Sequence, residues 1–379
     1  IPNSVADIAD RAFAGCTSLA EVTIIDGVGS VGEYAFYGCE SLEEVTIPNS
    51  VTNIGEYAFS SCSRLTKVTI LDGVTSIGER AFSDCSVLAE VTIPDSVTFI
   101  GYNVFSGCTG LIEIAVPAGV TSIEESMFSG CSSLVEVEIP DSVTDIDVFA
   151  FEGCTSLTSI TVDDENKIYT SKDGVLYTKD GEDLICCPAG KIGVFNIPRG
   201  VTIIDDAAFS GCNNLVEVTI PDSVEYIGGW KFEGCSSLIA IKVDNYNQTY
   251  TSRDGTLYTK DMKRLLRCPE GITGKYDIPI GVTDISHKAF RGCSGLQSIT
   301  IPKSVISVGK LAFDSCTGLE EVTILNSTMK IEEWAFQDCD DLKDVYYDGT
   351  EEQWDRVAIG DYNQCLTDAT IHYNWTRGL

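Results

Sequence analysis

The stretch LEEVTIPNSVTNIGEYAFSSCSR, residues 42–64, decides the fold, because close copies of it recur along the chain. Val45 and Ile47 are two residues apart, so they lie on one face of a short β-strand, with Thr46 on the opposite face. The Pro48-Asn49 pair then breaks the strand and turns the chain. The first half of the unit therefore predicts a strand with one buried and one exposed face.

The second half of the unit supplies the remaining apolar side chains. Val51 and Ile54 form a second apolar pair. The spacing of Phe59 and Cys62 predicts one tight helical turn that places both side chains on the same side. A single unit cannot bury this many apolar residues. Stacked copies bury them in a continuous core, with neighbouring parallel strands about 4.8 Å apart.

The motif Phe-x-x-Cys measures the repeat. Its phenylalanines are 23 residues apart, except at two steps of 58 residues, and they lie at Phe13, Phe36, Phe59, Phe82, Phe105, Phe128, Phe151, Phe209, Phe232, Phe290, Phe313 and Phe336. A chain of 379 residues would ordinarily suggest two or three domains. The regular spacing predicts one array of stacked coils instead.

Each step of 58 residues holds a second kind of coil, because residues 162–201 match residues 243–282 with an offset of 81. In the first copy, Gly174–Tyr177 and Leu184–Cys187 are expected to form the arms of a β-hairpin around a turn at Asp180–Gly181. Phe195–Ile197 then restores the strand of the main sheet, as Tyr276–Ile278 does in the second copy.

We therefore predict an α/β repeat solenoid. It is expected to be a curved right-handed superhelix with a parallel β-sheet on its concave side, built from about 14 coils of 23 residues. Two of these coils, near residues 163–198 and 244–279, carry the hairpins.

The solenoid is predicted to cover residues 1–345, and residues 346–379 are predicted to cap its end. Thr350–Gln353 is a capping-box signature that opens a short helix, and Ala369–Tyr373 reads as a last strand. A cap is expected because the end of a solenoid exposes its core. Ile1–Asn3 is interpreted as the tail of a strand, which predicts further repeats or a cap upstream.

These units resemble the BspA-like, or treponemal-type, leucine-rich repeats of bacterial surface proteins. The matching text is L-x-x-V-T-I-P-x-S-V-T-x-I-G-x-x-A-F-x-x-C, as in residues 42–62 and 88–108. The hairpin coils are similar to a variant repeat of that family, and Tyr346–Trp354 is similar to its C-terminal element. Departures are few: Val104, Met127 and Lys231 replace the Ala before Phe.

The resemblance implies a function as well as a leucine-rich-repeat fold. It implies a secreted or cell-surface, non-catalytic module that mediates protein–protein interaction or adhesion by binding host matrix or cell-surface proteins. A monomer is expected. Two alternatives stay open: a structural spacer without a ligand of its own, and a glycan-binding module. Glycan binding would require exposed aromatic platforms, which the strand positions nearly lack.

Composition excludes several classes of protein. With 57 acidic and 25 basic residues the formal charge is −32, which argues against nucleic acid and acidic membrane surfaces as partners. No apolar run is long enough to insert into a membrane. His287 and His372 are the two histidines, and no nucleophilic or phosphate-binding motif has usable spacing. We therefore expect no enzyme activity and no cofactor.

The 16 cysteines admit two interpretations, a disulfide scaffold or a ladder of buried free thiols. The repeat places one cysteine per ordinary coil on the apolar side, and stacked side chains that point the same way have poor disulfide geometry. We therefore predict free thiols that act as small apolar side chains. No C-x-x-C pair or nearby histidine supports a metal site.

The strand face opposite the core, on the concave side, is the candidate binding surface. It carries a threonine ladder beside a row of carboxylates. The candidate ligand-binding residues are Glu21, Glu44, Glu90, Glu113, Glu136, Glu138 and Glu217. They are interpreted either as a solvated surface or as a recognition face for a basic partner or Ca²⁺. Residues 1–160 hold 23 acidic and 4 basic residues, so the N-terminal half is the better place for a cationic ligand.

Two further features of the hairpin coils have both a structural and a functional interpretation. The acidic runs at Asp163–Asn166 and Asp180–Asp183 lack EF-hand spacing and are predicted to be solvated turns rather than calcium sites. Four tyrosines would contact a ligand if the hairpins project, or would pack on the neighbouring coil otherwise: Tyr169, Tyr177, Tyr250 and Tyr258.

Overall fold

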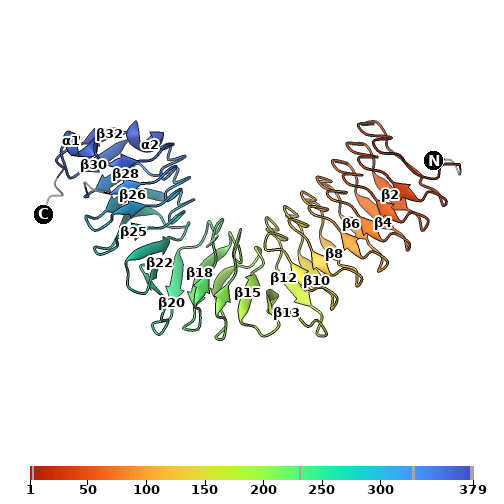
Figure 1. The fold of residues 1–379 in the computed structure, drawn as a ribbon, viewed down its shortest axis with the longest axis horizontal. Helices are drawn as coiled ribbons and strands as arrows, with labels where there is room; N and C mark the ends of the chain where they lie inside the picture. The colour runs from red at the N-terminus through yellow and green to blue at the C-terminus, as the bar shows by residue number, and fades with distance from the viewer. Residues whose placement is uncertain (2–3, 230–231, 327–328, 376–379) are drawn as a thin grey trace. The chain divides into compact units, whose positions relative to one another are not determined.

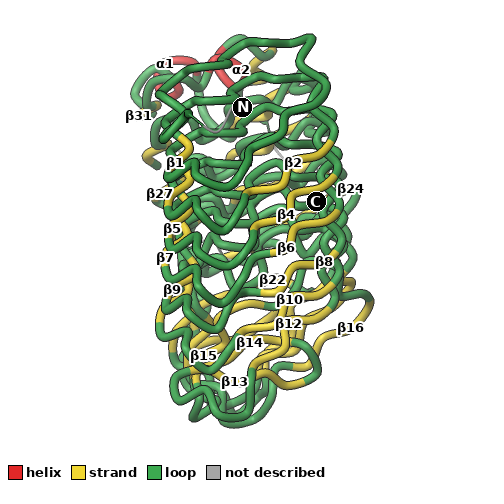
Figure 2. The backbone as a smooth tube through the Cα atoms, turned by 90° about the vertical axis from the view of Figure 1, so that its right-hand side faces the viewer, coloured by secondary structure: helices red, strands yellow, loops and turns green. Residues whose placement is uncertain are grey.

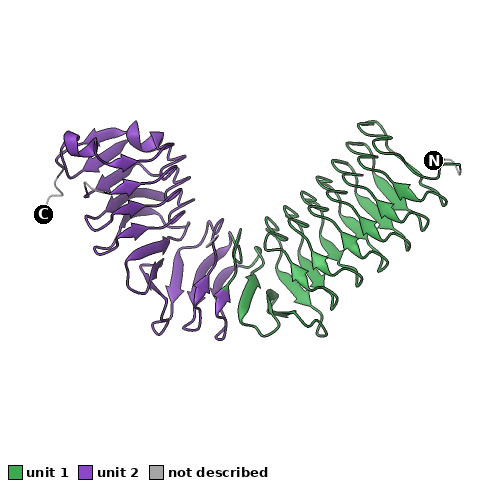
Figure 3. Cartoon of the chain, viewed as in Figure 1, with its two compact units in different colours: residues 1–191, 204–212 green, residues 192–203, 213–379 purple. Residues whose placement is uncertain are grey.

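A computed structural model of the chain describes residues 1, 4–229, 232–326 and 329–375. The chain forms two compact units, unit 1 with residues 1–191 and 204–212, and unit 2 with residues 192–203 and 213–379 (Figure 3). Each unit is a β-solenoid with nearly no helix (Figure 1). The predicted solenoid of parallel strands is confirmed, with about 15 turns of about 23 residues. The interpretations of Pro2-Asn3 and Lys231 fall outside the described residues.

Two ladders of short parallel strands stack along unit 1, and Figure 2 shows both columns. The main ladder comprises β2 (Glu44–Ile47), β4 (Lys67–Ile70), β6 (Glu90–Thr92), β8 (Glu113–Ala115), β10 (Glu136–Ile139) and β12 (Ser159–Val162). The second ladder comprises β1 (Ser30–Val31), β3 (Asn53–Ile54), β5 (Ser76–Ile77), β7 (Phe99–Ile100), β9 (Ser122–Ile123) and β11 (Asp145–Ile146). The second ladder was not foreseen from the sequence, although its Ile54 position was recognised as apolar.

Unit 2 repeats this plan. Its main-ladder strands form two sheets. The first holds β16 (Gly193–Asn196), β18 (Leu215–Ile220) and β20 (Ala240–Val243). The second holds β24 (Gly274–Asp277), β26 (Leu296–Ile301), β28 (Glu321–Ile324), β30 (Asp344–Tyr347) and β32 (Thr370–His372). Its two-residue strands are β19 (Tyr226–Ile227), β25 (Asp284–Ile285), β27 (Ser307–Val308), β29 (Lys330–Ile331) and β31 (Ala358–Ile359). A further one, β17 (Ile203–Ile204), has one residue in each unit.

The main ladder has the alternation that the sequence predicts. In β2, Val45 and Ile47 are buried, whereas Glu44 and Thr46 are exposed. Residues pair with the residue 23 positions later, so Val45 lies opposite Val68. A register set by a repeat of constant length stacks like on like. One continuous apolar core runs from Ile8 to Ile185 in unit 1, and another from Tyr258 to Leu366 in unit 2.

The segment of each coil that carries the Phe-x-x-Cys motif differs from the prediction. The helical turn expected at Ala58–Cys62 is a run of hydrogen-bonded turns, and Tyr57 and Ser61 have φ of 55° and 61°. The N–H groups of Tyr57, Phe59 and Ser61 each donate to a carbonyl of the next coil at 2.8 Å, while the N–H groups between them close local turns. This alternation satisfies the backbone both within and between coils, which a helical turn would not do.

Unit 1 has a seam in which neighbouring strands do not pair. Among the described residues, β6 is not paired with β8, and β7 is not paired with β9. The Val135 N–H donates to the Ile112 carbonyl at 3.0 Å, but no equivalent backbone bond joins Ile112 to the coil before it. The turns across the seam stay bonded, since the Phe105 N–H donates to the Met127 carbonyl at 3.0 Å.

Side-chain size gives the physical reason for the seam. The stacked phenylalanine rings are 5.0 Å apart at Phe36 and Phe59. They are 5.9 Å apart at Phe82 and Phe105, where β4 and β6 still pair, and 6.0 Å apart at Phe105 and Phe128. The residue before Phe is a buried Ala in most ordinary coils, whereas Val104 and Met127 occupy this position at the seam, both fully buried. Larger side chains in a close-packed core hold the neighbouring coils apart.

Each hairpin coil has three antiparallel strands rather than the two that were predicted. In unit 1 they are β13 (Tyr169–Lys172), β14 (Val175–Thr178) and β15 (Asp183–Cys186); in unit 2 they are β21 (Tyr250–Arg253), β22 (Thr256–Thr259) and β23 (Arg264–Arg267). The turn between β13 and β14 has positive φ at Asp173 and Gly174, the conformation of a type I′ turn. The predicted arms and the strands that restore the main ladder, β16 and β24, are confirmed.

A buried asparagine anchors each hairpin coil. The Asn166 amide donates to the carbonyls of Pro140 and Val143 at 2.8 and 2.9 Å. Its oxygen accepts from the N–H groups of Ile168 and Tyr169 at 2.9 and 2.8 Å. The equivalent Asn247 makes the same four bonds in unit 2. The first acidic run is therefore a structural turn, and the offset of 81 residues was the signal that marked this asparagine.

The C-terminal segment contributes Trp354, Val357 and Leu366 to the core of unit 2. The capping box is confirmed: Thr350 and Gln353 bond each other's backbone at the start of α1 (Glu351–Trp354). Before α2 (Gln364–Thr367), which was not predicted, the Asn363 side-chain oxygen accepts from the Phe336 N–H at 2.9 Å. In the preceding coil, Phe313 donates instead to the Ala335 carbonyl of the next coil. The Asn363 side chain thus takes the place of the turn carbonyl that the next coil supplies elsewhere.

Candidate functional site

The predicted glutamates are divided between the units. Glu44, Glu90, Glu113, Glu136 and Glu138 are exposed on the outer face of the main ladder of unit 1, the face opposite the core. Glu217 is partly buried in unit 2 and pairs with Lys242 at 2.7 Å. Glu21 is exposed but precedes the first strand of the ladder.

The carboxylate row is not continuous in unit 1. Lys67 lies in register between Glu44 and Glu90, and its ammonium group contacts Glu90 at 2.6 Å. This hydrogen bond raises the pKa of Lys67. Beyond the seam, Glu113 and Glu136 are direct register neighbours without a cation between them. The uncompensated acidic surface therefore begins at β8.

A hollow of about 500 Å³ lies at this point of the outer face. Its walls come from both sides of the seam, with Val91 and Thr92 of β6 on one side and Glu113 of β8 on the other. Glu136 and Glu138 of β10 complete the acidic wall. The sequence predicted these glutamates but not the hollow, because the hollow depends on the unpaired strands. Val104 and Met127 were its only sequence signal.

The cysteine ladder is unsuited to nucleophilic chemistry. The Cys62 Sγ donates to the Phe36 carbonyl of the preceding coil at 3.3 Å. The same contact, at 3.1–3.3 Å, is made by Cys39, Cys85, Cys108, Cys131, Cys154, Cys316 and Cys339. Burial raises the pKa of Cys39 and of Cys131 to about 12, so these thiols stay protonated near neutral pH.

One repeat cysteine differs from the prediction of a wholly buried ladder. Cys16 is exposed, because it belongs to the first coil and no described coil precedes it. The hairpin tyrosines are all buried: Tyr169, Tyr177, Tyr250 and Tyr258. Packing on the neighbouring coil therefore explains them, and they offer no contact surface.

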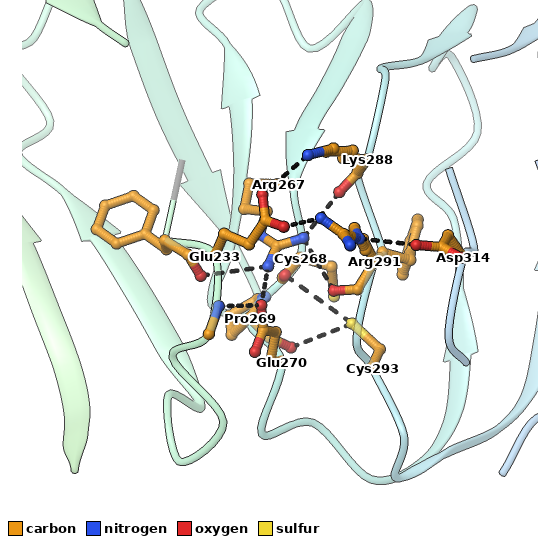
Figure 4. A network of polar contacts seen from close by, with 12 residues as sticks. Glu233, Arg267, Cys268, Pro269, Glu270, Lys288, Arg291, Cys293 and Asp314 are labelled. Atoms are coloured by element: carbon orange, nitrogen blue, oxygen red, sulfur yellow. Dashed lines mark hydrogen bonds and ion pairs between the residues drawn. The ribbon is translucent and has the colours of Figure 1, made fainter. Parts of the chain in front are cut away.

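A buried ion pair in unit 2 is the most enclosed charged group that the structure describes. The Arg267 and Glu270 side chains are 3% and 7% exposed and contact each other directly (Figure 4). The Arg267 guanidinium also donates to the carbonyls of Lys288 and Arg291 at 2.7 and 3.0 Å, and to that of Phe232 at 3.2 Å. It therefore joins the coils on either side of the hairpin coil.

Glu270 completes this bridge from the same coil. Its carboxylate accepts from the Gly234 N–H at 2.9 Å. Burial raises the pKa of Glu270 even though the Arg267 charge and the Gly234 hydrogen bond lower it. The hairpin coil lacks the Ala-Phe turn segment that supplies backbone partners to its neighbours elsewhere. The ion pair fills that place, which is a structural role.

An outer layer of charges surrounds the ion pair. Glu233 contacts Lys288 at 3.0 Å and also contacts Arg291 (Figure 4). The Arg291 Nε lies 2.7 Å from the Asp314 carboxylate. Each of these outer charges faces an opposite charge, which fits a structural role for the network.

At the equivalent place in unit 1, uncharged side chains replace the ion pair. The residues equivalent to Arg267 and Glu270 are Cys186 and Ala189. They line a cavity of about 10 Å³ together with Phe151 and other apolar neighbours. A cavity of this size holds about one water molecule. It is too small for an organic ligand.

Two kinds of site are absent from the described parts of the chain. No group of three or more His, Cys, Asp or Glu side chains there is arranged to hold a metal ion. No helix among those residues has the length and apolar character needed to cross a bilayer. The acidic hollow of unit 1, which contains three of the glutamates predicted from the sequence, is the candidate site.

Parallel strands repeated every 23 residues, joined by a Phe–Cys turn ladder, define a leucine-rich-repeat solenoid. The chain belongs to the family of the BspA type leucine rich repeat region: the family model matches residues 1–112, 108–178, 186–263 and 271–376. This family is a repeat family rather than an enzymatic one. No significant match is found among curated proteins.

Solved structures of bacterial repeat proteins are similar to this chain. A leucine rich cell surface protein from Faecalibacterium prausnitzii is 31% identical, over 93% of this chain and 90% of that one, with a TM-score of 0.57. A leucine-rich repeat protein from Eubacterium ventriosum is 24% identical, over 90% and 85%, with a TM-score of 0.58. The pneumococcal vaccine antigen PcpA is 19% identical, over 95% and 89%, with a TM-score of 0.60. The last two similarities concern the fold alone.

Proposed function

We propose that this protein is a non-catalytic, cell-surface interaction module that binds a basic segment of a partner protein on the outer face of unit 1. The acidic hollow carries this proposal, because Glu113, Glu136 and Glu138 converge there without a cation in the lining. Like charges on neighbouring strands repel, and a cationic partner would offset that repulsion. The surface location is supported by family membership and by the cell-surface relative that is 31% identical.

The partner is proposed to be a protein of the host matrix or of another cell. A strand ladder of fixed register offers a preformed surface, and a partner that binds it would pay little for reorganisation. The net charge of −19 over residues 1–160 would also attract a basic partner at a distance. A spacer without a ligand is the competing interpretation, and the following experiment separates the two.

The experiment is a solid-phase binding screen against fibronectin, fibrinogen, laminin and collagen. A variant carries Glu113→Gln, Glu136→Gln and Glu138→Gln. Its matched control carries Glu40→Gln, Glu56→Gln and Glu152→Gln, which are exposed carboxylates of unit 1 outside the main ladder. The hollow variant is expected to lose at least about tenfold in affinity, because close charge pairs at interfaces contribute more than 1.4 kcal/mol. The control, with the same change in net charge, is expected to bind nearly as the unchanged protein does.

Two outcomes contradict the proposal. Equal loss in both variants means that only the overall charge matters and that the hollow is not the site. No saturable binding by folded protein to any of the four ligands favours the spacer.

A further inference from the structure

The main ladder of unit 2 ends in three aromatic rings that only the fold brings together. Tyr346 of β30 stacks on His372 of β32, with ring centroids 4.7 Å apart and ring planes at 15°. Trp375 lies against Tyr346, with centroids 5.5 Å apart and planes at 48°. The Trp375 N–H donates to the Tyr347 carbonyl at 3.0 Å. This bond between backbone groups places the Trp375 main chain beside β30, and the indole contacts the Tyr346 ring from there.

A hydrogen bond to Asp344 holds the His372 ring of this three-ring platform in place. The His372 Nε2 lies 2.6 Å from the Asp344 carboxylate, its neighbour on the outer face. A ring held by both stacking and a hydrogen bond loses less freedom when a ligand binds. Tyr346, His372 and Trp375 are all partly exposed, which leaves ring surface for contact.

Beside the platform lies a hollow of about 320 Å³. Its polar lining comes from neighbouring strands in register, with Lys275, Ser298 and Glu321 in one row and Thr300, Thr323 and Tyr346 in the next. Trp375 closes one side. The volume is at the lower end of the range of about 300–1,000 Å³ for small-molecule sites.

The lining favours a neutral ligand rich in hydroxyl groups. It contains one ammonium group, Lys275, and one carboxylate, Glu321, together with the hydroxyls of Thr323 and its neighbours. The lining holds one charge of each sign, and the Lys275 ammonium also lies 3.6 Å from the Asp277 carboxylate outside it. The lining of the hollow in unit 1 holds three carboxylates and no aromatic ring instead. A sugar ring has apolar C–H faces that stack on aromatic rings and a rim of hydroxyls that donate and accept hydrogen bonds.

We propose that this hollow binds a neutral oligosaccharide. One sugar ring stacks on Tyr346 and Trp375, and its hydroxyls bond to Glu321, Thr323 and Lys275. The hollow lies on a partly exposed strand face, so a longer chain continues along the ladder. This site is separate from the acidic face of unit 1 and takes a different class of ligand.

The test is isothermal titration of the full chain with maltotriose, cellotriose, xylotriose, mannotriose and the trisaccharide of N-acetylglucosamine. At least one of them is expected to bind. Trp375→Ala is expected to weaken that binding at least about tenfold, since loss of one aromatic contact removes about 1.4 kcal/mol. Trp375→Phe keeps a stacking surface and is expected to restore most of the affinity. Tyr226→Ala removes an aromatic that is 54% exposed in β19, outside the hollow, and is expected to bind as the unchanged protein does.

Three outcomes overturn the proposal. The first is that no trisaccharide binds the folded protein at about 10 mM, a concentration that would reveal even weak sites. The second is that binding persists undiminished in Trp375→Ala. The third is that tetramethylammonium binds in a Trp375-dependent way while the trisaccharides do not, which would identify a cation–π site instead. None of these bears on the acidic face, so the two proposals fail independently.

Discussion

At the scale of single residues, a few side chains form hydrogen bonds with backbone groups that the backbone of an ordinary coil would otherwise bond. Asn166 and Asn247 anchor the hairpin coils, and Asn363 supplies the acceptor that a turn carbonyl of the next coil supplies elsewhere. Beside the second hairpin, the Arg267–Glu270 ion pair likewise bonds backbone groups of the neighbouring coils. Each bonds backbone groups that an ordinary coil would satisfy, so their contribution to stability comes from preventing buried unpaired groups.

Breaking this ion pair is predicted to destabilise unit 2. Glu270→Ala leaves the Arg267 charge buried without its partner, which costs about 3–5 kcal/mol. The double variant Arg267→Cys with Glu270→Ala copies the uncharged solution of unit 1 and is expected to lose less stability than Glu270→Ala alone. The measurement is the midpoint of urea unfolding.

The order of the two midpoints decides this prediction. A double variant less stable than Glu270→Ala would show that the Arg267 hydrogen bonds to the neighbouring carbonyls outweigh the cost of its unpaired charge. The unchanged protein provides the reference.

At the scale of the elements, side-chain size controls whether neighbouring strands pair. The Ala before Phe lets ordinary coils approach closely, and Val104 and Met127 prevent this approach at the seam. The unpaired edges of β6 and β8 then form the acidic hollow. Two substitutions in the core thus shape a surface on the opposite side of the coil.

Hydrogen exchange tests the seam. The Ile112 N–H lacks the bond to the preceding coil that the Val135 N–H makes, so a peptide covering residues 110–117 is expected to exchange faster than one covering 133–140. In a variant with Val104→Ala and Met127→Ala, the coils can close and the first peptide is expected to gain protection. Equal exchange of both peptides in the unchanged protein would mean that the strands pair in solution.

At the scale of the whole molecule, charge distinguishes the two proposed sites. The acidic hollow of unit 1 depends on Coulomb attraction between exposed groups, which salt screens over about 10 Å at 0.1 M. The aromatic hollow of unit 2 depends on stacking and on hydrogen bonds to a neutral ligand. The two binding reactions are therefore expected to respond differently to salt.

Raising the salt concentration separates these reactions in one sample. Between about 50 mM and 500 mM sodium chloride, binding of the basic partner is expected to weaken strongly, because the Debye length falls severalfold. Trisaccharide affinity, measured by titration under the same conditions, is expected to change by less than twofold. If the basic partner binds equally well at both concentrations, the charge-based site in unit 1 is wrong.

The fold and the exposed strand positions of most of the predicted glutamates follow from the amino-acid sequence. A repeat of 23 residues fixes the register, and the alternation of Val45, Thr46 and Ile47 fixes which face is buried. The hairpin arms and the capping box were equally predictable, because each depends on residues close together in the chain. These features depend on residues within one repeat, so the interpretation of one copy applies to the other copies.

Only the tertiary structure decided where the surface is hollowed and what lines each hollow. The seam arises from core packing between coils, which no local pattern reports. The aromatic platform joins Tyr346 to His372 and Trp375, residues that lie 26 and 29 positions further along the chain. The sequence argued against glycan binding because strand positions hold few aromatics. The fold adds rings from the cap, since stacking brings distant positions within contact distance.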